Sequence, residues 1–393
     1  MEAESGPAPA AARPRRSGFA DALRGFALIG ICVANLPWIA SSPEGRSALD
    51  QAARLLVLFF VEGKFFVLFS FLFGFGFQRQ LARMREGGAG PGAYARRLAA
   101  LFVLGALHAA LLYVGDILAT YALLGSALWL VRDRPDASLL RVARVCVVVA
   151  AAFFAFLAWT YAGGDPDAAA AAVADQAAAR RAYLGGFGEA LARRLEDLPF
   201  GLGGVVLFKG PLAFAAFCAG VVAGRRGLLD HPARLGRALP SVPLLAAGAA
   251  LGNLGAAASY LLPGGWPSAA SYALLAVGAP CLSALYALAL AHAWRAIPRA
   301  RAWMGAWLAP AGRLSLSNYL GQSVAANAIF LGWGLGLYGS LGEAALLVLA
   351  LAIAAAGLVA SAVWLRRFRT GPAEWLLRAW ARAGTTARAR APG

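Results

Sequence analysis

Charged residues are scarce in this chain of 393 residues: they make up 14%, whereas about a quarter of a soluble domain is charged. Hydrophobic residues make up 60%, more than a soluble domain of this length can bury. Cysteine is also rare, and its four copies lie singly within apolar segments without a CxxC pair. The cysteines therefore predict neither a disulfide framework nor a metal site.

Apolar runs close to the length of a membrane crossing, about 20 residues, recur along the whole chain. They predict an all-α, polytopic integral membrane protein with about ten transmembrane helices. The expected spans are 21–40, 55–77, 98–114, 117–131, 142–163, 202–223, 242–262, 270–294, 311–338 and 341–365.

Arginine is distributed unevenly between the two sets of connecting segments. The termini and the loops on their side hold 26 arginines, and the opposite loops hold six. The positive-inside rule then places both termini in the cytoplasm, which requires an even number of spans. The net charge of +17 is thereby explained by topology, and no nucleic-acid partner is expected.

Three regions follow from this pattern. Residues 1–17 are expected to be a disordered cytoplasmic tail, and 18–370 a single transmembrane domain. Residues 371–393 predict a cytoplasmic interfacial helix and tail, because Trp375, Leu376 and Trp380 form an apolar stripe beside arginines. The acidic external loop 164–201 contains an expected helix at 168–179; a lid and a solvated cap both remain open for it.

The chain has only two lysines, Lys64 and Lys209, and both fall inside predicted spans. A lysine in hydrocarbon costs about 2.5–3.5 kcal/mol on insertion scales, so each must face protein or water. Glu62 lies at a similar depth, but at i and i+2 it and Lys64 point in different directions. The three residues are candidates for a functional cluster, although Glu62 could instead extend to the membrane surface.

His108 and Asp116 complete this cluster. His108 is close to mid-membrane, and Asp116, eight residues later at the outer end, falls on nearly the same helix face. A packing role for His108 and a helix-capping role for Asp116 remain open as alternatives.

Two other polar stretches enter the predicted spans. Asp21 and Arg24 can pair at i and i+3 near the start of the first span, and Asn35 lies toward its outer end. In the ninth span Arg313 could bind a phosphate. The polar residues after it either bind substrate or join helices: Ser317, Asn318 and Tyr319.

These stretches resemble the YeiB-like family of bacterial membrane proteins (domain of unknown function 418) over nearly the whole chain. The matching residues are Asp21, Arg24, Gly25 and Asn35; Glu62, Gly63, Lys64 and Phe65; Leu72, Phe73, Gly74 and Gly76; His108, Gly115 and Asp116; Gly312, Arg313, Ser317, Asn318 and Tyr319; and Trp364 to Trp375. The resemblance implies a multi-pass protein of the bacterial cytoplasmic (inner) membrane.

The D-x-x-R-G start of the first helix is also loosely similar to membrane acyltransferases of the acyltransferase-3 and heparan-glucosaminide N-acetyltransferase types. That similarity implies transfer of an acyl group from cytoplasmic acyl-CoA to an extracytoplasmic, lipid or glycan acceptor, with no tightly bound cofactor. Asn35 occupies the place of the catalytic histidine, which leaves His108 as base, with Asp116 orienting it and Lys64 or Lys209 stabilising an oxyanion. Arg24 and Arg313 would bind the CoA phosphates.

Two alternatives remain beside this enzyme. The cluster of Glu62, Lys64, His108 and Lys209 also suits a proton-coupled or anion transporter or a flippase. A non-catalytic scaffold is the third hypothesis, but it leaves both buried lysines unexplained. The bilayer is an expected partner in each case, and the sequence does not define the oligomeric state.

Overall fold

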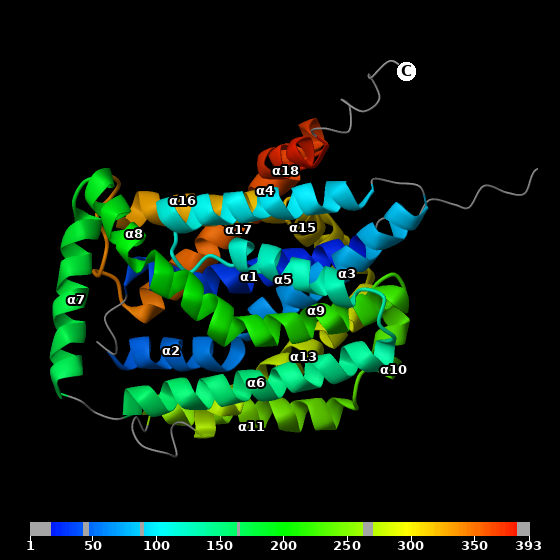
Figure 1. Ribbon diagram of the computed structural model, residues 1–393, viewed down its shortest axis with the longest axis horizontal. Helices are drawn as coiled ribbons and strands as arrows, with labels where there is room; N and C mark the ends of the chain where they lie inside the picture. Colours follow the sequence, from blue (N-terminus) through cyan, green and yellow to red (C-terminus); the bar gives the residue numbers. More distant parts are fainter. Residues whose placement is uncertain (1–16, 42–46, 87–89, 163–165, 262–269, 383–393) are drawn as a thin grey trace, which may run out of the picture.

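The computed structural model describes residues 17–41, 47–86, 90–162, 166–261 and 270–382, and within these ranges every regular element is a helix (Figure 1). The predicted tail 1–17 lies almost entirely outside the described residues, as does 383–393. The prediction of an all-α, polytopic membrane protein is confirmed.

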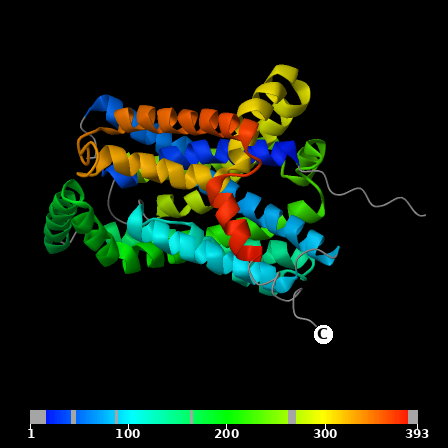
Figure 2. The same cartoon turned by 90° about the horizontal axis from the view of Figure 1, so that it is seen from above.

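The long helices run roughly side by side, as both views show (Figures 1 and 2). They are α1 (Gly18–Ala40), α2 (Ala48–Phe60), α3 (Lys64–Arg85), α4 (Pro91–Leu111), α5 (Leu118–Val131), α6 (Asp136–Ala162), α9 (Gly210–Arg225), α11 (Val242–Leu261), α13 (Leu275–Ala296), α16 (Ser315–Phe330) and α17 (Glu343–Arg367). Shorter elements connect them: η2 (Pro232–Arg234), α10 (Leu235–Ala238), α14 (Pro298–Trp303), η3 (Met304–Leu308) and α15 (Ala309–Arg313).

Eight helices in the described ranges are long and apolar enough to cross a membrane. They are Gly18–Ala40, Ala48–Arg85, Pro91–Leu111, Asp136–Phe156, Phe187–Arg225, Val242–Leu261, Ala270–Ala296 and Glu343–Arg367. They correspond to eight of the ten predicted spans, and the other two are shorter helices.

The first short helix, α5, has 14 residues; one face of it is buried in the bundle, while Leu123 and Leu130 on the other face are exposed. Its Tyr121 is buried against Phe73 and Phe217. A helix of that length covers only about 21 Å, less than the ~30 Å thickness of the hydrocarbon core.

The second, α16, is shorter than the predicted span 311–338, because that segment breaks at Leu314 and the helix ends at Phe330. The Asn318 side chain donates to the carbonyl oxygen of Leu314 at 3.0 Å, so this carbonyl has a hydrogen-bond partner at the break. After Phe330 the chain turns back, with Gly336 at φ 68°.

The predicted external loop 164–201 is helical over most of its length. Its first helix, α7 (Pro166–Leu184), contains the predicted helix 168–179 and stands upright at one end of the bundle (Figure 1). Its second, α8 (Phe187–Gly204), continues into η1 (Val205–Lys209) and α9, so residues 187–201 are helical and continuous with the sixth predicted span.

A charge pair joins the two helices of this segment to each other. Glu189 accepts from the N–H of Gly186 at the start of α8, and Arg193 pairs with Asp175 of α7 at 2.8 Å. The hydrogen bond from Arg193 lowers the pKa of the Asp175 carboxyl, so this link stabilises the fold above the normal carboxyl pKa and is lost as pH falls through the lowered value.

Glycines allow the helices around the site to cross in backbone contact. A Cβ on Gly312 would lie 1.8 Å from the carbonyl oxygen of Asp21, and one on Gly25 would lie 2.0 Å from that of Leu308. The α1 helix therefore crosses η3 and α15 without intervening side chains, which is a packing mode typical of membrane helices. This crossing fixes Asp21 and Arg24 beside Arg313.

Candidate functional site

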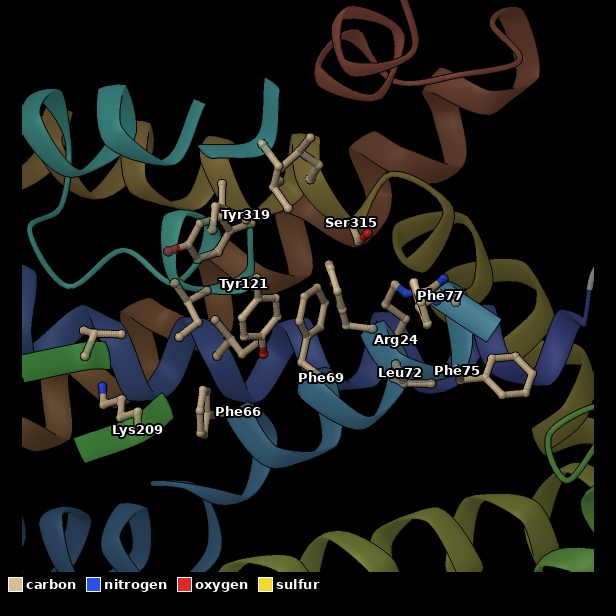
Figure 3. A pocket seen from close by; sticks show the side chains of 18 of the residues that line it. Arg24, Phe66, Phe69, Leu72, Phe75, Phe77, Tyr121, Lys209, Ser315 and Tyr319 are labelled. Atoms are coloured by element: carbon tan, nitrogen blue, oxygen red, sulfur yellow. The ribbon is translucent and has the colours of Figure 1, made fainter. Parts of the chain in front are cut away.

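A cavity of about 1180 Å³ runs through the bundle along α1. Its lining includes Ser17 at one end of α1 and Trp38 at the other, about 21 residues apart or roughly 32 Å of helix. That length is close to the ~30 Å thickness of the hydrocarbon core. Figure 3 shows Lys209 at one end of this cavity and Arg24 with Ser315 at the other.

The end beside the N-terminus of α1 is rich in arginine. Six guanidinium groups line it, from α1, α3, α4, α15 and α18 (Pro372–Arg382). They are Arg24, Arg79, Arg83, Arg97, Arg313 and Arg378. Arg24 pairs with Asp21 at 3.1 Å, as the sequence predicts, and Arg79 pairs with Asp230 at 2.7 Å.

The middle of the cavity is aromatic. Phe66, Phe69 and Tyr121 lie between the two ends, with Tyr319 across from them (Figure 3). The Tyr121 hydroxyl is 2.6 Å from that of Ser70, so its polar group has a partner while its ring faces the cavity. This section can hold an apolar chain or a flat ring system.

Lys209 and Glu62 mark the far end. Lys209 is the last residue of the π-helical turn η1, in which the Gly210 N–H bonds to Val205. Pro211 follows and has no N–H to continue the α-helical ladder. The Lys209 side chain is exposed, although it lies deep in the protein, because it faces the cavity. No described residue accepts a hydrogen bond from it.

Glu62 lies at the break between α2 and α3, where Gly63 adopts φ 82°. Its carboxylate lines the cavity, lies 3.2 Å from Arg54 and is the acidic group within electrostatic reach of Lys209. The far end of the cavity thus combines an amine and a carboxylate.

Lys64 faces away from the cavity. Its side chain is fully buried, and its ammonium donates to the carbonyl of Leu58 at 2.5 Å, in the last turn of α2. A positive charge at that position also stabilises the negative end of the helix dipole. The prediction that Glu62 and Lys64 point in different directions is confirmed. Lys64 stabilises the break between α2 and α3 through its hydrogen bond to Leu58.

His108 lies next to the cavity but does not line it. Its Nδ1 is 2.8 Å from Asp116, which confirms their predicted proximity, and its Nε2 is 2.9 Å from Ser323. Asp116 also accepts from Tyr319 at 3.3 Å and from the Ala119 N–H at 2.9 Å. The pair therefore reaches the cavity through the Tyr319 ring.

The remaining predicted residues divide into two groups. Asp21, Asn35 and Arg313 line the cavity. Ser317 and Asn318 join helices: Ser317 donates to Glu374 of α18 at 2.5 Å, and Asn318 donates to Ser361 of α17 at 2.7 Å.

Glu374 is the most informative residue that the sequence reasoning missed. Its carboxylate accepts from the N–H groups of Leu316 and Ser317 and so caps α16. From the sequence, Arg83 and Arg97 count only toward topology and Arg378 only toward topology and the interfacial helix, because neither pattern shows which arginines point inward. In the described ranges no group of three or more His, Cys, Asp or Glu side chains could hold a metal.

Known proteins resemble the chain along most of its length. It is 32% identical over 386 residues to the uncharacterized protein YxaH of Bacillus subtilis (strain 168), covering 92% of this chain and 93% of YxaH. It is 28% identical over 389 residues to the uncharacterized protein YeiB of Escherichia coli (strain K12), covering 91% and 94%. The family described as "Protein of unknown function (DUF418)" matches residues 223–384. The chain therefore belongs to the YeiB-like DUF418 family.

Proposed function

We propose that this protein is a membrane acyltransferase that takes an acyl group from cytoplasmic acyl-CoA and delivers it to an acceptor at the outer side of the bacterial cytoplasmic membrane. One observation carries the proposal: a single cavity joins an arginine-rich end, an aromatic middle and an amine–carboxylate end. Its volume exceeds the 300–1,000 Å³ of pockets that hold drug-sized ligands. It suits a donor with a phosphorylated head and a long arm.

The orientation of the donor follows from the charges. Arg24 and Arg313 at the arginine-rich end would hold its phosphates, and the arm would extend past Tyr121 toward Lys209. The positive-inside rule assigns the arginine-rich end to the cytoplasm, where acyl-CoA is made.

The reaction would take place between Glu62 and Lys209. The Glu62 carboxylate accepts the proton of the acceptor hydroxyl or amine, whose oxygen or nitrogen attacks the thioester carbonyl carbon. Lys209 stabilises the oxyanion that forms. The C–S bond then breaks, and CoA leaves as a thiolate that takes up a proton.

Glu62 replaces His108 as the base in this scheme. Glu62 lines the cavity, whereas both ring nitrogens of His108 have partners outside it. His108 and Asp116 then act as positioning residues that hold the hydroxyl of Tyr319.

The test is transfer from radiolabelled acyl-CoA by the purified protein in lipid nanodiscs with lipid and glycan acceptors. We expect labelled acceptor, and a loss of transfer of about 10²-fold or more in Glu62→Gln with acyl-CoA binding retained. Glu86→Gln, at the exposed end of α3, is the matched control. The absence of both acyl-CoA binding and acyl-CoA-dependent labelling would contradict the proposal.

A transporter or flippase for a phosphorylated amphiphile is the second candidate. It is favoured by the extent of the cavity, whose lining reaches both ends of α1. Proteoliposome flux of such an amphiphile without acyl-CoA, and dependent on Lys209, would favour transport over transfer.

A further inference from the structure

Four of the arginines that line the cavity come from four different helices. Arg24 belongs to α1, Arg83 to α3, Arg97 to α4 and Arg378 to α18. Arg97 lies within electrostatic reach of the other three. Residues far apart in the sequence therefore place four guanidinium groups around one space.

Fewer carboxylates than guanidinium groups line this end among the described residues. Asp21 and Glu374 are the carboxylates that line this end among the described residues. Asp21 pairs with Arg24, and Glu374 caps α16. The side-chain hydrogen bond of Arg97 goes to Gln80, which is uncharged. Like charges at such proximity repel, and a bound anion would remove that cost.

The fourth arginine is supplied by α18, which bridges α16 and α4 at the end of the bundle (Figure 2). Arg96 of α4 donates to the carbonyl of Ala381 at 3.1 Å, and Glu374 attaches the other end of α18. Leu377 and Arg378 line the cavity, while Trp375 and Trp380 are exposed, as expected of an interfacial helix. The α18 helix thus forms one wall of the arginine-lined space.

We propose that Arg24, Arg83, Arg97 and Arg378 form one binding site for a phosphate-bearing ligand, and that the occupied site holds α18 against α4 and α16. Several guanidinium groups around one anion give the strong, charge-assisted recognition that phosphate oxygens favour. The inference deepens the proposed function and rests on it, since it names the residues that recognise the phosphorylated head of the donor. The phosphate could belong to a soluble nucleotide or to a lipid headgroup.

The test uses the full chain in nanodiscs and two sources of phosphate. Inorganic pyrophosphate is titrated calorimetrically into phosphatidylcholine nanodiscs, and a second set contains phosphatidylglycerol without pyrophosphate. In both sets, Leu377→Cys reports the closure of α18 through its rate of thiol labelling, with the unsubstituted protein as the blank. The comparison variants are Arg97→Ala and Arg85→Ala; Arg85 lies on α3, does not line the cavity and forms an exposed pair with Asp133.

We expect pyrophosphate to bind, to slow labelling at Leu377→Cys severalfold, and to bind about tenfold more weakly to Arg97→Ala but equally to Arg85→Ala. Protection by phosphatidylglycerol alone would support the site with a lipid as its ligand. If neither source slows labelling, or if both arginine variants weaken binding equally, the inference is overturned. Pyrophosphate binding without acyl transfer would refute the proposed function and leave the inference standing. Acyl transfer that is unaffected by Arg97→Ala would refute the inference and leave the proposed function standing.

Discussion

Lys64 and Lys209 have the same side chain and both fall inside predicted spans, yet they have different surroundings. Lys64 is fully buried and donates to a helix carbonyl. Lys209 is exposed to a cavity, and no described residue accepts a hydrogen bond from it. An ammonium group with a protein acceptor stabilises the fold, whereas one that faces a cavity is available to a ligand.

The largest effect is expected from Lys209→Met. It should reduce acyl transfer about 10²-fold or more, because the oxyanion loses its stabilising charge, while the unfolding temperature changes little. The measurement is acyl-CoA-dependent labelling beside thermal unfolding of the same preparation. Lys209→Arg, which keeps the charge, should recover part of the transfer. Full activity in Lys209→Met would contradict the role of Lys209 in acyl transfer.

Lys64→Met should give the opposite result. Its free energy of unfolding should fall by about 1–3 kcal/mol, because the carbonyl of Leu58 is left without a partner in the membrane domain. Denaturant unfolding in detergent measures this loss, and Lys209→Met is the matched control. Acyl transfer per folded molecule should stay near the unsubstituted value. An unchanged stability would show that the Leu58 contact does not hold the helix break.

Ser283→Ala should have the smallest effect. The Ser283 hydroxyl lies 2.7 Å from the backbone carbonyl oxygen of Lys64 and 2.8 Å from that of Ala279 and shares its one proton between them, so its loss removes one support of the break. We expect a decrease of about 0.5–1.5 kcal/mol in the free energy of unfolding and no change in transfer. A decrease as large as that of Lys64→Met would indicate that the hydroxyl, not the ammonium, holds this region.

The arrangement of the membrane domain was predictable because hydropathy and arginine counts depend on composition along the chain. Eight of the ten spans have helices of full length, while α5 has only 14 residues and α16 begins after the break at Leu314. The burial of α5 depends on Phe217, nearly a hundred residues away. No local pattern around Tyr121 contains that information.

The site was predictable in part. Seven of the twelve candidate residues line the cavity, and they include Glu62, Lys209 and Arg313. Hydropathy assigns Lys64 and Lys209 the same value, because it carries no information on where a side chain points. That direction depends on where the helix breaks. Gly63 precedes Lys64 at the break between α2 and α3, and Pro211 follows Lys209 beyond the π-helical turn. These two residues are the local signals that distinguish the lysines.

One cavity connects the arginine-rich end with Lys209. The most direct test replaces each lysine by cysteine and applies a small, membrane-impermeant thiol reagent from the side that carries the termini, with the unsubstituted protein as the blank. We expect rapid labelling of Lys209→Cys, slowed by acyl-CoA, and no labelling of Lys64→Cys. Equal labelling of both variants, or none at Lys209→Cys, would contradict this connection.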